Sequence, residues 1–212
     1  MSDACRPLDS EVLREYDIRG RVGVNLSADD AFTIGRAFAA ILKARCAHLP
    51  TLTCAVGYDG RLSSPALEAR LVEGLAQSGV NVVRIGLGPT PMLSFANATL
   101  DVAAALMVTG SHNPPQANGV KMPPGGTPFY GRDIQELGRV AAAGAFNDGL
   151  GAVREVDIFE TYVERVLEGY GEGRELTVAW DPGNGAAGMA VEALVKRLPG
   201  THVVINSAID GT

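Results

Sequence analysis

Apolar residues recur along the chain with two periods, which predict short buried strands followed by amphipathic helices. Residues 30–47 place apolar side chains three and four positions apart, and Ser27 precedes them as a candidate N-cap, so a long helix is predicted there. Residues 53–58 are a short apolar run typical of a buried strand. The same analysis predicts a helix from Ser64 (N-cap) and Pro65 to Gly79, strands at 80–85 and 102–109, and helices at 89–100 and 131–143.

A second group of elements follows a stretch rich in glycine, Asn and Asp at 142–151, which is typical of a linker. Helices are predicted at 157–170 and 185–197, and strands at 176–180 and 202–206. Strand and helix alternate in both groups, which indicates an α/β fold with helices on the two faces of a sheet and the functional loops at one end of its strands. We expect two domains, residues 1–150 and 151–212, the second with too few strands to bury much apolar surface alone.

Composition narrows the functional class. The 212 residues are 46% hydrophobic and 20% charged, with a net charge of −6 and no basic stripe, so nucleic acid is not expected as a partner. The longest apolar run, residues 102–108, is far too short to span a bilayer, so no membrane association is expected. Cys5, Cys46 and Cys54 lack the spacing of a zinc site or a disulfide framework, and acidic residues interrupt the N-terminal region, so we expect a reducing cytoplasmic location.

The segment with the clearest chemistry is T-G-S-H-N-P-P at residues 109–115, followed by N-G-V-K at 118–121. Ser111 comes directly after a buried strand, and the two prolines favour an extended loop, so its hydroxyl is presented at the strand end. His112 and Lys121 are close enough in sequence to activate the hydroxyl or to neutralise a phosphate on it. Composition alone favours a different interpretation, a turn in which Ser111 and Asn113 only cap backbone groups.

Four stretches in the same order resemble the α-D-phosphohexomutase family of phosphomannomutases and phosphoglucomutases. They are residues 13–20 (L-R-E-Y-D-I-R-G), residues 56–65 (V-G-Y-D-G-R-L-S-S-P), the Ser111 loop with Lys121, and residues 178–188 (V-A-W-D-P-G-N-G-A-A-G). The resemblance implies a layered α/β/α domain with a mixed sheet, repeated, with the second copy truncated in this chain. One position departs from the family pattern, since Tyr58 stands where an arginine usually precedes the Asp, which puts a substrate role of that loop in doubt.

The resemblance implies that the serine of the matched loop, Ser111, carries a phosphoryl group and exchanges it with a hexose phosphate through a hexose 1,6-bisphosphate. The hexose 1-phosphate and 6-phosphate of mannose, glucose or both would be interconverted. By motif match, His112 and Lys121 flank the phosphoserine, while Tyr16, Arg19, Asn113 and Lys121 bind substrate. An ordinary ion pair with Asp17 or Glu15 is the alternative for Arg19, and Arg61 is expected to organise its loop rather than to touch substrate.

The family also uses Mg²⁺, which the Ser111 phosphate would help to hold. No D-x-D sequence is present in this chain, so the carboxylate ligands of that ion are not found here. The sugar-selecting loop of the third domain and the phosphate loop of the fourth are also not found. We therefore expect the 212 residues to be the N-terminal part of a mutase that needs domains 3 and 4 for a complete site, and to lack measurable mutase activity alone.

Three other functions are alternatives to a hexose phosphate mutase. G-x-G-x-x-G at 183–188 follows a predicted strand and has Asp210 downstream, as in a dinucleotide-binding oxidoreductase, but Asp181 would place a carboxylate near the pyrophosphate. A serine hydrolase needs G-x-S-x-G, which T-G-S-H-N does not match. A non-catalytic sugar-phosphate-binding fragment stays open.

Overall fold

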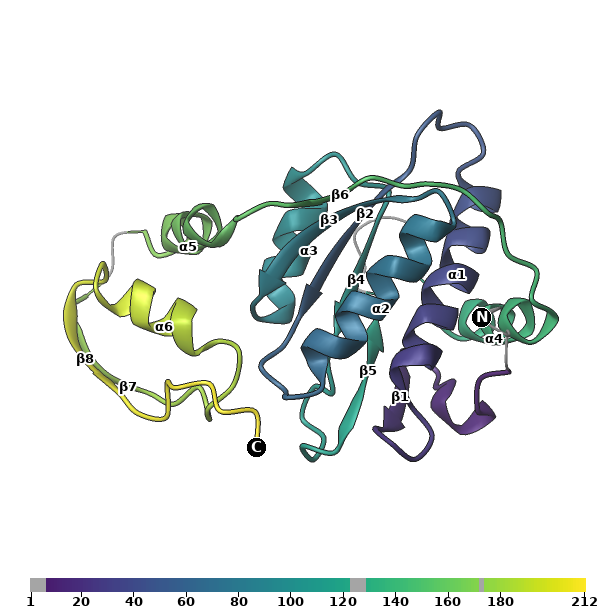
Figure 1. Ribbon diagram of the computed structural model, residues 1–212. Helices are drawn as coiled ribbons and strands as arrows, with labels where there is room; N and C mark the ends of the chain where they lie inside the picture. The colour runs from purple at the N-terminus through teal and green to yellow at the C-terminus, as the bar shows by residue number, and fades with distance from the viewer. Residues whose placement is uncertain (1–6, 123–128, 172–173) are drawn as a thin grey trace.

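The computed structural model describes residues 7–122, 129–171 and 174–212. Its larger unit is built on a six-stranded sheet with the order β1-β5-β4-β2-β3-β6, and its smaller unit on a parallel pair, β7-β8 (Figure 1). Strands β1 and β5 are antiparallel to their neighbours and the other pairs of the large sheet are parallel, so the sheet is mixed, as the resemblance implies. The strands are β1 Ile18–Arg21, β2 Thr53–Tyr58, β3 Asn81–Leu87, β4 Ala104–Val108, β5 Ala117–Lys121, β6 Val153–Glu155, β7 Leu176–Trp180 and β8 Gly200–Val204.

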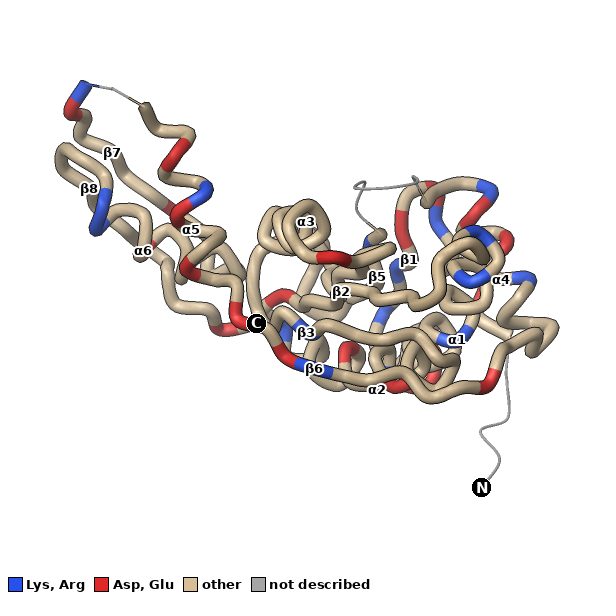
Figure 2. Tube along the Cα trace, turned by 90° about the horizontal axis from the view of Figure 1, so that it is seen from above, with Lys and Arg blue, Asp and Glu red and all other residues tan. Residues whose placement is uncertain are grey.

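Helices cover both faces of the large sheet, which confirms the layered α/β/α class. Helices α1, α2 and α4 pack on one face and α3 on the other, as Figures 1 and 2 show from two directions, and each face has its own buried apolar cluster. Within the described residues, no helix is both long and apolar enough to cross a bilayer. The helices are α1 Ala28–Arg45, α2 Ser64–Gln77, α3 Thr90–Thr99, α4 Arg132–Ala143, α5 Phe159–Glu168 and α6 Gly188–Val195, with a 3-10 turn, η1, at Ser10–Val12.

Most predicted elements are present, with shifted ends. Ser27 caps α1 as expected: its hydroxyl accepts from the Asp30 amide, and the Asp30 carboxylate accepts from the Ser27 amide at 2.8 Å. The N-cap of α2 was predicted wrongly. Ser63, not Ser64, occupies that position. Ser64 is the first residue of the helix; it is buried, and its hydroxyl donates to the Asp59 carboxylate at 2.6 Å.

Three strands of the large sheet, β1, β5 and β6, were not predicted. Each is short and carries polar residues or glycine, so no apolar alternation marks it. Strand β6 belongs to the segment that follows the predicted linker, and it pairs with β3 at the edge of the sheet. The domain boundary predicted at residue 150 stays a prediction.

Two glycines bring α1 and α2 unusually close together. A Cβ atom at Gly35 would lie 2.4 Å from the Leu71 carbonyl oxygen, and one at Gly74 would lie 2.2 Å from the Phe32 carbonyl oxygen. Both distances are shorter than van der Waals contact, so the close approach of the helices needs glycine on each side.

A buried ion pair connects α2 to the sheet. Glu68 on α2 is fully buried, and its two carboxylate oxygens accept from Nε and Nη2 of Arg84 on β3 at 2.8 and 2.6 Å. The third nitrogen, Nη1, contacts Glu155 on β6 at 3.2 Å. These hydrogen bonds to the Glu68 carboxylate raise the pKa of Arg84 above its ordinary value, so the guanidinium stays charged and anchors α2 and the edge strand β6 to the same residue.

The cysteines are free thiols where the structure describes them. Cys54 is buried in β2 and burial raises the pKa of its thiol far above the ordinary range, so it remains neutral and unreactive. Cys46 is partly buried at the end of α1, and Cys5 lies outside the described residues.

Replacing Gly35 with alanine should destabilise the protein by about 1–3 kcal/mol, because the added methyl group overpacks the contact between α1 and α2. The free energy of unfolding from urea titration measures the effect. Gly169→Ala is the matched control, since that exposed position at the end of α5 has only the Val166 carbonyl within reach and a helical φ of −76°. Equal stability of the two variants would contradict the helix-contact argument.

Candidate functional site

Ser111 lies where the buried strand β4 ends and the chain turns into the loop before β5. Its φ is +55°, a left-handed conformation that is uncommon for a residue with a side chain. The Ser111 amide donates to Oγ1 of Thr109 at 2.9 Å, so the turn is held from inside the loop. The serine side chain therefore projects away from the core, as the sequence analysis predicted.

Arg61 fixes the shape of this loop. Its Nη1 donates to the carbonyl oxygens of Pro114 and Ala117 at 2.7 and 3.0 Å, and its Nη2 donates to those of Ser111 and Asn113 at 2.9 and 2.7 Å. Four carbonyls of one loop thus point at one guanidinium. The expectation that Arg61 organises the loop agrees with this geometry.

The loop must leave room for that guanidinium. A Cβ atom at Gly110 would lie 2.5 Å from the Arg61 Cζ atom and 2.6 Å from the Ala117 carbonyl oxygen. Glycine before the serine is thus required by the close packing of the arginine against the loop backbone.

Asp59, at the end of β2, holds the other side of the arrangement. One carboxylate oxygen accepts from the Ser64 hydroxyl at 2.6 Å and from the Arg61 amide at 3.1 Å. The other accepts from the Thr109 hydroxyl at 2.7 Å, from Nε of Arg61 at 3.2 Å and from the Gly110 amide at 3.3 Å. Because β2 and β4 are neighbours in the sheet, this carboxylate joins the ends of both strands to the start of α2.

Asn118 completes the support from below the loop. It is fully buried, and its amide nitrogen donates to the hydroxyls of Ser63 and Ser64 at 2.8 and 2.9 Å. Asn118 thereby connects the first residues of β5 to the first turn of α2. The start of this helix contacts Asp59 as well, so it positions both Asp59 and the strand that carries Lys121.

Two nitrogens lie close to the Ser111 hydroxyl. Nζ of Lys121, at the end of β5, donates to Oγ at 3.2 Å, and Nδ1 of His112 lies 3.4 Å from Oγ. The three residues are therefore brought together as predicted. An exposed hydroxyl with an ammonium group and an imidazole beside it is an arrangement that could activate a nucleophile.

The other predicted site residues lie farther from the hydroxyl. Asn113 folds back on the loop, where its amide nitrogen donates to the Gly110 carbonyl at 3.0 Å. Arg19 forms an ion pair with Asp17, the alternative considered from the sequence, while its buried Nε has no partner. Tyr16 is 75% exposed and its ring lies 6.4 Å from that of Tyr130.

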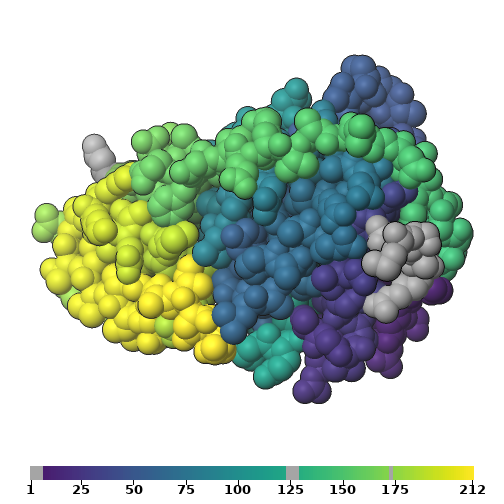
Figure 3. Space-filling view, viewed as in Figure 1, coloured from purple at the N-terminus to yellow at the C-terminus, as the bar shows by residue number. Residues whose placement is uncertain are grey.

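Ser111 opens into a cleft between the two units, with a volume of about 420 Å³. Figure 3 shows the C-terminal residues (yellow) against the surface of the larger unit (blue), and the contact there is tight: a Cβ atom at Gly211 would lie 2.5 Å from the Gly60 carbonyl oxygen. The larger unit lines the cleft with Asp59, Gly60, Arg61, Pro89, Thr90, Thr109, Ser111, Asn113 and Pro115, and the smaller unit with Pro182–Ala187 and Asp210–Thr212.

The glycine-rich segment 183–188 forms the turn between β7 and α6. Gly183 and Asn184 have φ of +59° and +55°, and a Cβ atom at Gly188 would lie 1.9 Å from the Ser207 carbonyl oxygen. The Asp181 carboxylate accepts from the Gly183 amide at 2.9 Å. It therefore occupies a backbone donor that a bound pyrophosphate would need. These glycines serve a tight turn, and the geometry does not favour dinucleotide binding.

The described residues do not form a magnesium site. No group of three or more His, Cys, Asp or Glu side chains in that part of the chain is placed to hold a metal ion. Both oxygens of Asp59 are occupied by the hydrogen bonds given above, and Asp181 accepts from Gly183 and Asn206. Within the part of the chain that the structure describes, no such cluster of ligands stands beside the Ser111 hydroxyl.

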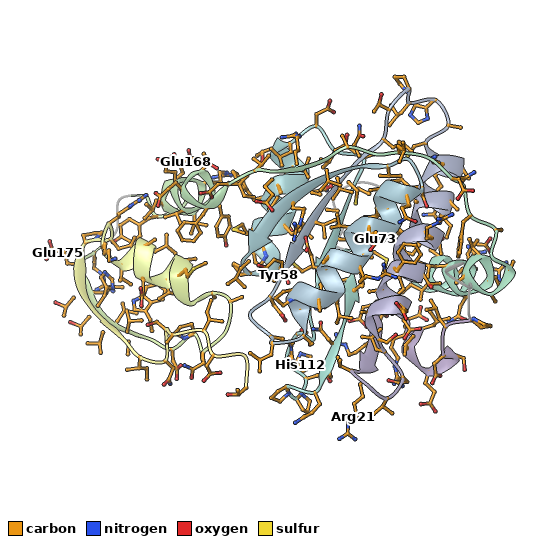
Figure 4. All side chains as sticks on the ribbon, in the orientation of Figure 1. Arg21, Tyr58, Glu73, His112, Glu168 and Glu175 are labelled. Atoms are coloured by element: carbon orange, nitrogen blue, oxygen red, sulfur yellow. The ribbon has the colours of Figure 1, made fainter. Side chains whose placement is uncertain are left out.

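Sequence analysis missed the roles of Asp59, Thr109 and Asn118. A signal was available for Asp59. It follows the buried strand β2 directly, and the carboxyl ends of parallel neighbours such as β2 and β4 lie at the same edge of the sheet. Thr109 and Asn118 belong to the motifs of the Ser111 segment, but no local pattern indicates their supporting role, because their partners are 50 and 55 residues away in the sequence. Tyr58 is partly buried and, as Figure 4 shows, lies away from His112, so it takes no part in the Ser111 cleft.

Replacing Arg61 with alanine should remove about 1–3 kcal/mol of stability and loosen the loop, since four carbonyls and the Asp59 carboxylate lose their donor. Hydrogen exchange followed by mass spectrometry should show faster exchange in a peptide that covers residues 110–117. Arg139→Ala is the control, since that arginine forms an exposed i,i+3 ion pair on α4. Unchanged exchange at 110–117 in Arg61→Ala would contradict the role assigned to the guanidinium.

Comparisons with known proteins agree with this geometry. A family model described as phosphoglucomutase/phosphomannomutase, alpha/beta/alpha domain I, matches residues 10–148. The matched segment contains β1 to β5, α1 to α4 and the whole Ser111 loop.

Individual relatives match beyond that segment. A phosphomannomutase/phosphoglucomutase of Pseudomonas aeruginosa is 37% identical over all 212 residues, which cover 45% of its length. A phosphoglucomutase of Neisseria gonorrhoeae is 38% identical over 203 residues, which cover 95% of this chain and 43% of the length of that relative. A crystal structure of a phosphoglucomutase/phosphomannomutase family protein from Burkholderia thailandensis superposes with a TM-score of 0.89 at 38% identity, covering 96% of this chain and 45% of that one. The chain spans less than half the length of these relatives.

Proposed function

The chain belongs to the phosphoglucomutase/phosphomannomutase family, and we propose that it supplies the phosphoryl-carrying serine of a hexose phosphate mutase. The proposal rests on one observation above all: Ser111 is exposed at a strand end with Lys121 Nζ 3.2 Å from its hydroxyl. The names of the relatives support isomerase chemistry on phosphorylated glucose or mannose. The substrate of this protein, its phosphoserine and its activity are part of the proposal.

The proposed step is a transfer between two oxygens. Oγ of Ser111 attacks the phosphorus of a hexose 1,6-bisphosphate, an Oγ–P bond forms, and the bond from phosphorus to one sugar oxygen breaks. The proton that Oγ loses passes to that sugar oxygen through the nitrogens beside it, so the products are a phosphoserine and a hexose monophosphate. In the complete cycle, the phosphoserine first donates its phosphoryl group to the free hydroxyl of a hexose monophosphate. The resulting 1,6-bisphosphate turns round, and the step described above then returns its other phosphoryl group to Ser111, which leaves the isomeric monophosphate.

Charge explains why cations stand at this position. A phosphoserine carries about −1.5 to −2 charges at pH 7, and phosphoryl transfer is accelerated chiefly by positioning and by positive charge near the transferring group. Lys121 supplies one such charge directly at Oγ, and His112 supplies a group that can hold or release a proton. The rigid loop held by Arg61 supplies the positioning.

Tyr16, Arg19 and Asn113 are proposed to bind the sugar or its phosphates, and Asn113 lines the cleft. Mg²⁺ is proposed as the cofactor of the whole enzyme, with ligands other than the Ser111 phosphate outside this chain. Net turnover is proposed to require the further part of the relatives that this chain does not span, and a cytoplasmic location is proposed from the sequence composition.

Incubation of the chain with glucose 1,6-bisphosphate should add the mass of one phosphoryl group to the intact protein. Peptide mapping should place that group on Ser111, because its hydroxyl is exposed and flanked by Lys121. Ser111→Ala should remove the added mass, whereas Ser207→Ala, a serine of the smaller unit, should leave it unchanged. Phosphate on another residue, or none on the unchanged chain, would overturn the proposal.

Lys121→Ala should slow this phosphorylation about 10²- to 10³-fold, the usual effect of removing one donor that stabilises developing charge in a transition state. The rate comes from the intact mass as a function of time at fixed bisphosphate concentration. Lys196→Ala, at the C-terminal end of α6, is the matched control and should react at the original rate. A Lys121→Ala rate within twofold of the control would show that the lysine is only a solvated strand-end residue.

A further inference from the structure

One face of the large sheet is covered by α3 over β2 and β4, whereas no helix of the described residues lies on that face over β1 and β5. The register identifies this face: Met107 of β4 belongs to the apolar cluster under α3, and it pairs with Lys121 of β5. Arg19 pairs with Gly119 and Arg21 with Ala117. Since paired residues and residues two apart share a face, Arg19, Arg21 and Lys121 all project from this side of the sheet.

Small residues form the floor between these cations. Gly119 and Ala117 are the only residues that β5 contributes to this face besides Lys121, so no large side chain of that strand stands between the arginines and the lysine. Successive positions on one face of a strand are about 7 Å apart. The three cations thus follow a shallow strip along two paired strands, and Figure 2 shows the basic residues on these strands.

Arg21 differs from Arg19 in the ion pairs of its guanidinium. Arg19 is paired with Asp17, the residue directly before β1, whereas Arg21 is exposed and forms no ion pair within the described residues. An arginine that neutralises no carboxylate of its own protein keeps its full charge and its planar set of donors for an external anion.

Arg21 also lies at the end of the strip nearest the Ser111 loop. The amide of the next residue, Val22, donates to the Gln116 carbonyl at 2.9 Å, and the Ala117 carbonyl opposite Arg21 accepts from Arg61. The strand that carries Arg21 is therefore bonded to the last residues of the loop that presents the nucleophile. Figure 4 shows Arg21 and His112 at the same end of the molecule.

We infer that Arg21 is an additional phosphate-binding residue of the Ser111 site, where its guanidinium contacts a phosphate group of the phosphorylated sugar. The inference rests on the proposed function for the identity of that ligand. Arg21 would add to the residues already proposed to bind the sugar phosphate, since Arg19 is paired with Asp17 and Lys121 donates to the serine hydroxyl.

Calorimetric titration of the chain with glucose 1,6-bisphosphate at low and at physiological ionic strength tests the inference. Arg21→Ala should weaken the affinity about fivefold to tenfold, as expected for a charged hydrogen bond at an exposed site, and should reduce the salt dependence of binding. Arg21→Lys keeps the charge but loses the planar pair of donors, so about a twofold to threefold loss is expected. Arg154→Ala, an exposed arginine on β6 at the opposite edge of the sheet, should bind as the unchanged chain does.

The outcomes separate this inference from the proposed function. If Ser111 is phosphorylated by the bisphosphate while Arg21→Ala and Arg154→Ala bind alike, the inference is wrong and the proposed function stands. If Arg21→Ala binds more weakly but Ser111 takes up no phosphoryl group, the binding role stands and the transfer chemistry fails. Absence of measurable binding by the unchanged chain would also overturn the inference. Circular dichroism of each variant confirms that the fold is retained.

Discussion

The pairing of Arg61 with Asp59 inside the Ser111 loop is the interaction on which the rest of the site depends. A loop whose carbonyls converge needs a donor at its centre, and a guanidinium with five N–H groups in one plane can satisfy four carbonyls and a carboxylate together. The Asp59 carboxylate then links this loop to β2, to β4 and to α2. Because those elements contribute to the hydrophobic core, the left-handed backbone of Ser111 is held by the buried part of the larger unit.

This arrangement separates positioning from chemistry. The donors and acceptors of Asp59, Arg61 and Asn118 form hydrogen bonds to the loop and to the elements that support it. Few of these groups are therefore available to bind a ligand. Lys121 and His112 make few internal contacts and lie beside the hydroxyl. A rigid inner layer with an outer layer of available cations is what phosphoryl transfer requires, since its rate depends on geometry and on compensation of negative charge.

The sequence predicted the parts of the fold that have a local signal. Buried strands such as β2 and β4 are apolar runs, and α1 carries its capping box in Ser27 and Asp30, so both could be recognised without a structure. Strand β1, with two arginines and a glycine among four residues, forms only because β5 pairs with it across about 100 residues of chain. Such pairing is decided by tertiary contacts, which a local pattern does not contain.

The same distinction holds for the site. Ser111, His112 and Lys121 were identified from a contiguous motif, and the hydrogen bonds show that they meet. The residues that hold them, Asp59, Thr109 and Asn118, lie on three different elements and could not be assigned from spacing.

The cleft lies between two units of the chain. Ser111 and its supports belong to the larger unit, whereas the turn that faces them, Pro182–Ala187, belongs to a unit joined by the extended segment around β6. Gly211 of that unit lies against the backbone of Gly60, the residue between Asp59 and Arg61. The units also meet where Tyr162 of α5 packs against Phe95 of α3, with ring centroids 5.9 Å apart. The loop that carries Arg61 therefore contributes to both sides of the cleft, since it shapes the Ser111 loop and contacts the chain that forms the opposite wall.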